Sequence, residues 1–154
     1  MSKVQPPRLF QLVKTLEDVA ADQPTIRTIV RNDVFRINSA PSLKYGVFAW
    51  LQGQHSGNVS SSLMSYQFTL FYVDRLTEDG GNQVEIQSTG CQTLTNIIRS
   101  LEDKGVYADS FTLQPFNQRF TDQCAGVFAN VTFQIPATSM CSEDNVDNNS
   151  IMIF

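Results

Sequence analysis

The stretch GVFANVTFQIP at residues 126–136 constrains the fold more than any other part of the chain. Apolar side chains occupy every second position and polar side chains lie between them, a strict alternation that predicts a β-strand with one buried and one open face. Pro136 ends the strand, because proline has no N–H to donate to a neighbouring strand. The buried face is predicted to consist of Val127, Ala129, Val131, Phe133 and Ile135.

The residues leading into this strand, DQCAG at 122–126, raise the question of a reactive cysteine. A nucleophilic Cys124 would need a base, normally a histidine oriented by Asn or Asp. The only histidine is His55, which we place in an exposed Gly/Ser-rich loop. We therefore expect Cys124 to be a small buried side chain and DQCAG to be a bend or bulge, with Gly126 supplying backbone freedom.

Two amphipathic helices are predicted, at residues 7–21 and 88–104, because apolar residues recur at three- and four-residue steps. Ser88 or Thr89 is the expected cap of the second helix. Gly105 follows its last turn, where a left-handed residue is favoured. The buried stripe of the second helix is predicted to be Cys91, Leu94, Ile97, Ile98 and Leu101.

The remaining strand signals predict a sheet of about five or six antiparallel strands packed by two helices, an α+β fold. Asn32-Asp33 is a turn candidate, residues 53–62 are predicted to be a flexible loop, and residues 77–83 a turn around Gly80-Gly81. Pro115 predicts an edge strand or a bulge. The other predicted strands cover 26–31, 34–37, 44–52, 64–75 and 110–120.

Composition argues against most kinds of chemistry. The formal charge of −4 and the scattered Lys and Arg give no footprint for wrapping nucleic acid. Three cysteines without a C-x-x-C spacing and a single histidine predict neither a disulfide framework nor a metal site. The acids Asp74, Glu78 and Asp79 are expected to be solvated at a turn. We therefore expect no enzymatic activity, no cofactor and no membrane association.

The chain is predicted to form one domain over residues 1–136, followed by a C-terminal segment over residues 137–154. Acids and asparagines dominate residues 142–150, which predicts a solvated linker. The last five residues, SIMIF, are mostly apolar and need a surface to bury against. Two destinations remain open: the sheet edge of a neighbouring subunit, by β-augmentation, or the chain's own sheet.

The order of elements and two longer phrases resemble a known family. The passages FYVDRLTED…STGCQTLTNIIRSL and QPFNQRFTDQCAGVFANVTFQIP are similar to the tail-terminator or tail-completion proteins of tailed bacteriophages, particularly small structural proteins of Bacteroides-type, crAss-like phages. The resemblance covers roughly residues 5–136 and leaves the C-terminal segment outside.

This resemblance implies a non-catalytic subunit of a head–tail connector ring, with six- or twelve-fold symmetry, in the neck or tail of the virion. Such a ring assembles in the host cytoplasm, joins the portal to tail components and lets genome DNA pass through its lumen without specific binding. A second class of function stays open, a non-catalytic adaptor or assembly chaperone for a phage tail protein. The candidate inter-subunit contacts are Ile151, Met152, Ile153, Phe154, His55, Gly80 and Gly81.

Overall fold

The computed structural model describes residues 8–33, 44–60, 63–117 and 123–136. Within these ranges the chain forms two helices and five strands, which confirms the predicted α+β class. The elements, in chain order, are α1 (Arg8–Ala21), β1 (Thr28–Arg31), β2 (Val47–Asn58), β3 (Leu63–Arg75), α3 (Gln83–Glu102), β4 (Tyr107–Asn117) and β5 (Cys124–Pro136).

The five strands form one sheet in the order β1-β2-β3-β5-β4. Three of the four pairings are antiparallel, but β1 runs parallel to β2, so the sheet is mixed and the expectation of a wholly antiparallel sheet is wrong in this detail. Asn32, which follows β1, has a positive φ of 49°, as suits the predicted turn. The predicted strand at 34–37 lies outside the described residues.

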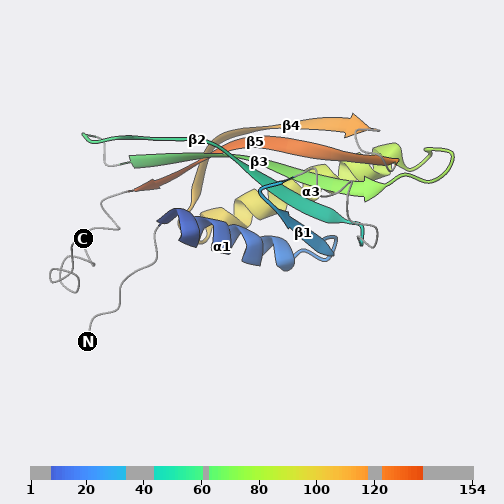
Figure 1. Cartoon of the computed structure of the whole chain (residues 1–154), viewed down its shortest axis with the longest axis horizontal. Coiled ribbons are helices and arrows are strands. Elements are labelled where there is room, and N and C mark those ends of the chain that lie inside the picture. The colour runs from blue at the N-terminus through green and yellow to red at the C-terminus, as the bar shows by residue number, and fades with distance from the viewer. Residues whose placement is uncertain (1–7, 34–43, 61–62, 118–122, 137–154) are drawn as a thin grey trace.

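Both helices cover the same face of the sheet (Figure 1). We call this the helix face and the other the open face. The predicted stripes of α1 and α3 pack there against alternate residues of the central strands, including Phe68, Leu70 and Val127. The alternation of β5 predicted this burial correctly, because Val127, Ala129, Val131, Phe133 and Ile135 are each at most 6% exposed.

The open face carries a second, smaller apolar cluster at the end of the sheet near the β3–α3 turn. Its buried members are Val30, Val47, Ala49, Phe71, Val73, Phe116 and Cys124. The structure therefore confirms that β3 is central and apolar on both faces.

The predicted flexible loop at 53–62 is wrong for most of its length. Strand β2 continues to Asn58 and pairs with β3 down to Leu63, with a register shift between Gln52 and His55. Backbone hydrogen bonds to β3 therefore keep residues 53–58 extended, although their Gly- and Ser-rich composition favours a loop.

Helix α3 begins at Gln83, five residues before the predicted start, so Ser88 and Thr89 lie inside the helix and are not its caps. The helix extends one turn earlier than predicted because Ile86 adds a buried side chain to the apolar stripe of α3. Asn82 stabilises the preceding turn, because its side-chain Oδ1 accepts a hydrogen bond from the Thr77 N–H at 2.9 Å. Gly105 has φ 85°, which confirms the left-handed end of the helix.

The predicted bend or bulge at DQCAG is wrong where the structure describes it, whereas the predicted burial of Cys124 is confirmed. Residues Cys124–Gly126 lie inside β5 and pair with Arg75, Asp74 and Val73 without a register shift. Gly126 serves close packing instead of flexibility, because a Cβ there would collide with the Tyr72 carbonyl oxygen. Strand β4 is an edge strand of the described sheet, as Pro115 predicted, and its register shift lies farther back, between Ala108 and Phe111.

Candidate interaction surfaces

The structure does not bring Cys124 and His55 together. Cys124 pairs with Arg75 at one end of β3, whereas His55 pairs with Tyr66 near the other end. Nine residues of extended strand separate these positions, about 30 Å. Cys124 also belongs to the cluster on the open face, whereas the His55 ring packs edge-on against Tyr66 and tilted against Phe68, whose rings belong to the helix-face core. These two residues cannot act as nucleophile and base.

His55 is half-buried, so its predicted position in an exposed loop is wrong. Its ring lies 5.2 Å from the ring of Tyr66 and 5.8 Å from that of Phe68, and its Nε2 bonds to Oε1 of Gln52 at 2.9 Å. Its buried Nδ1 has no hydrogen-bond partner within the described ranges. These contacts make His55 an anchor that fixes the distal part of β2 onto β3.

Gly80 and Gly81 lie in the turn between β3 and α3, at the opposite end of the sheet from the β2–β3 connection (Figure 1). Asp79 organises this turn, because its Oδ1 accepts from the Thr77 hydroxyl at 2.7 Å and from the Gly81 N–H at 2.9 Å. These two bonds lower the pKa of Asp79. The acids here stabilise a turn, and among the described residues no group of His, Cys, Asp or Glu is placed to hold a metal ion.

The distal part of the β2–β3 hairpin projects beyond both helices (Figure 1). We call residues 52–60 and 63–65 the distal hairpin. Most of its residues are exposed, and none is charged, because the chain has no Asp, Glu, Lys or Arg between Lys44 and Asp74. This long uncharged run was visible in the sequence, but its importance was missed because the segment was taken for a loop. None of the helices in the described residues is long and apolar enough to cross a membrane.

The open face next to the distal hairpin is polar, and the side chains that line a hollow on it are uncharged. A shallow hollow of about 270 Å³ lies across β2, β3, β5 and β4 there. Thr69 donates a hydrogen bond to Oδ1 of Asn130 at 3.1 Å on neighbouring strands. The residues around the hollow include Gly53, Gln67, Thr69, Thr112, Asn130 and Thr132.

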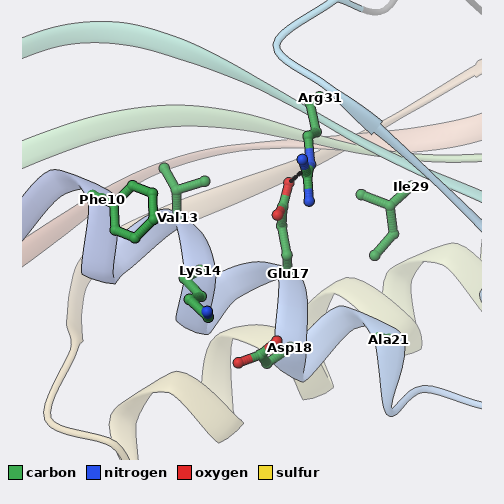
Figure 2. A pocket seen from close by; sticks show the side chains of 8 residues that line it. All are labelled: Phe10, Val13, Lys14, Glu17, Asp18, Ala21, Ile29 and Arg31. Carbon is green, nitrogen blue, oxygen red and sulfur yellow. Dashed lines mark hydrogen bonds and ion pairs between the residues drawn. The ribbon is translucent and has the colours of Figure 1, made fainter.

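A larger groove of about 560 Å³ lies between α1 and the edge strand β1 (Figure 2). Most of its surface is apolar, contributed by Phe10, Val13, Ala21 and Ile29. Phe10 is 58% exposed, unusual for a phenylalanine beside a concave apolar surface. The sequence pointed to the helix but not to the groove, because the position of β1 beside α1 is a tertiary feature.

An ion pair spans this groove from β1 to α1. Glu17 Oε2 accepts a hydrogen bond from Nε of Arg31 at 2.8 Å (Figure 2) and a second one from the indole N–H of Trp50 at 2.9 Å. The Glu17 side chain is only 13% exposed, so two donors compensate for its desolvation. Lys14 and Asp18 lie farther along the same helix and complete the polar rim.

This geometry defines an α+β single-sheet protein with an uncharged projecting hairpin and an apolar groove at one edge. No protein-family model matches the chain, and no curated protein matches it in sequence.

Proposed function

We propose that this protein is a structural subunit of a tailed-bacteriophage particle. In this proposal it forms a ring in the head–tail connector or tail, joins the portal to tail components and extends the channel through which DNA passes. The observation that carries the proposal is the distal hairpin, which is exposed, projecting and free of charged side chains.

Charged residues normally make up about a quarter of a soluble chain, and most of them are exposed. They are depleted where a surface is buried against another protein. The absence of charged side chains on the distal hairpin therefore favours a contact with another protein. A projecting element that fits a different patch of an identical neighbour makes a head-to-tail contact, which closes into a ring when the rotation allows it.

The charge distribution also suits a wall of a DNA channel. The chain carries a net charge of −4, and the polar hollow on the open face is lined by uncharged side chains. Tight binding to DNA depends mainly on Lys and Arg that neutralise phosphates. A neutral or acidic lumen lets DNA move past without being held, which supports passage without specific binding.

The test places charge on the distal hairpin. The double substitution Gln54→Lys and Ser56→Lys changes two exposed residues, so we expect an unchanged melting temperature but loss of rings, measured by negative-stain microscopy and analytical ultracentrifugation. Gln92→Lys with Asn96→Lys, on the exposed side of α3, is the matched control and should still form rings. A stably monomeric wild-type protein that is absent from phage particles would refute the proposal.

A second candidate is a non-catalytic adaptor or assembly chaperone for a phage tail protein. The observation that favours it is the groove between α1 and β1, because an adaptor needs a concave apolar surface for its client. This candidate predicts a protein present in infected cells but absent from purified particles, which immunoblotting of both fractions decides.

A further inference from the structure

We propose that the groove between α1 and β1 is a docking site for the chain's own C-terminal residues Ile151–Phe154, which add as a strand antiparallel to β1. This inference concerns the single subunit and does not depend on the proposed ring. It chooses between the two destinations that the sequence leaves open for the apolar segment.

The groove offers an apolar surface next to a strand edge that has no partner among the described strands. Val13 and Ile29 are only half-buried along it, and Phe10 is largely exposed at one end (Figure 2). Among the described strands, β1 pairs only with β2, so its other edge has no strand partner there. Every second residue of such an edge turns its N–H and C=O outward, and an added strand would satisfy these groups and point alternate side chains into the groove.

The topology of the sheet brings the C-terminal segment to the correct end. Strand β5 ends at Pro136, opposite Leu63, at the end of the sheet where the distal hairpin lies. Strand β1 is parallel to β2 and therefore points toward the same end. A chain that turns back after β5 thus approaches β1 from its Arg31 end and runs antiparallel to it. Figure 1 shows that α1 also begins on this side of the molecule.

The intervening residues are long enough for this path. The position beyond β1 lies four strand spacings from β5, about 19 Å, given the order of the strands. Arg31 pairs with Trp50, which pairs with Leu70, seven residues along β3 from Leu63, or about 23 Å. The combined distance is about 30 Å, whereas residues 137–150 can span up to ~46 Å.

Tethering within the same chain favours this destination, whereas charge is neutral toward it, because the groove is lined by Lys14 and Arg31 but also by Glu17 and Asp18. A tether of this length gives an effective concentration of about 1 mM, so even a weak intrinsic affinity keeps the groove occupied.

A double-mutant cycle on dilute monomer tests the docking. Deleting residues 150–154 should lower the melting temperature by about 5 °C. Phe10→Ser, at an exposed position, should lower it by a similar amount in the full chain. In the deleted chain the same substitution should change it by less than about 1 °C, because the docked segment is already gone. Additive effects, or no effect of the deletion, would overturn the proposal.

A cross-linking experiment distinguishes docking within one chain from exchange between copies. In a Cys141→Ser background, Lys14→Cys with Ser150→Cys should form an intramolecular disulfide under mild oxidation. The matched control also replaces Ile151–Phe154 by serines, and its disulfide should form about tenfold more slowly. Equal rates would overturn the docking, and a disulfide-linked dimer as the main product would show that a second copy fills the groove instead.

Discussion

The two faces of the sheet are made by the same strands but are built differently. The helix face is apolar along the whole of β5, from Ala125 to Ile135. The open face is apolar only near the β3–α3 turn and becomes polar and uncharged toward the distal hairpin. The comparison shows that alternation along one strand predicts which face is buried against the helices. Whether the other face is apolar or polar depends on the side chains of the neighbouring strands.

Charge distinguishes the three inner strands of the sheet from the rest of the described molecule. Strands β2 and β5 have no charged residue, and β3 has only Asp74 and Arg75 at its end. Most charged residues of the described ranges lie in the helices and turns. The polar part of the open face therefore avoids both the cost of burying charge and the attraction of phosphates, which suits a surface used for contact.

The largest expected effect comes from placing a charge on the helix face. Val131 is 3% exposed, so Val131→Asp buries an unpaired carboxylate and should cost about 4 kcal/mol or more, enough to unfold most of the protein. Circular dichroism and soluble yield measure this outcome. The neighbouring Asn130→Asp, on the open face, keeps the acceptor for Thr69 and should change stability by less than about 0.5 kcal/mol. Similar losses for both variants would contradict the distinction between the faces.

The next effect tests whether the open-face cluster is packed as tightly as the helix face. In Gly126→Ala the new Cβ would collide with the Tyr72 carbonyl oxygen and lie 2.9 Å from the Phe116 ring, so we expect a loss of about 3 kcal/mol in urea unfolding. Gly53→Ala, on the polar part, places its Cβ 3.1 Å from Cβ of Gln67 at an exposed site and should cost less than about 1 kcal/mol. A tolerated Gly126→Ala would mean that this cluster is loosely packed.

A smaller effect concerns the polar boundary of the helix face. Trp50→Phe removes the N–H donor to Glu17, and hydrogen bonds to charged groups contribute about 1.5 kcal/mol or more. Arg31→Gln removes the other donor, but the Arg31 side chain is 73% exposed, so its loss should be under about 0.5 kcal/mol. Chemical denaturation of both variants gives the order, and the reverse order would show that the ion pair dominates.

The smallest effect appears only at high pH. Burial, together with the nearby Asp74 carboxylate, raises the pKa of Tyr72 to about 12 from a usual value near 10. The folded state therefore favours the neutral phenol, and this contribution to stability is present below pH 10 and lost as the pH rises toward 12. Melting temperatures from pH 8 to 11.5 should fall more steeply for the wild type than for Tyr72→Phe. Parallel curves would show that Tyr72 is not coupled to folding.

The sequence predicted those elements whose own periodicity matches their environment. The stripe of α1, the alternation of β5 and the two apolar faces of β3 all follow from local pattern, and all are confirmed. The left-handed Gly105 was predictable for the same reason, because helix ends favour glycine in a left-handed conformation.

The features that the sequence missed depend on partners distant in the chain. The extension of β2 to Asn58 requires pairing with β3, and the parallel pairing of β1 reflects the sheet order. Gly126 looked like a source of flexibility because its close approach to Tyr72 is a contact between strands. The α1–β1 groove needs both elements in place, so no local pattern marks it.

The central position of β5 has a consequence for the order of events during synthesis. Strands β3 and β4 are made earlier, but β5 lies between them, so neither can complete its ladder until residues 124–136 have left the ribosome. Pairings between distant segments form slowly, because the conformational entropy of the intervening loop is lost before the new contacts stabilise the pair. Within the described sheet, the nascent chain therefore exposes one free edge of β3 and a β4 without its partner strand until late, and a chain truncated before β5 should aggregate rather than form a smaller domain.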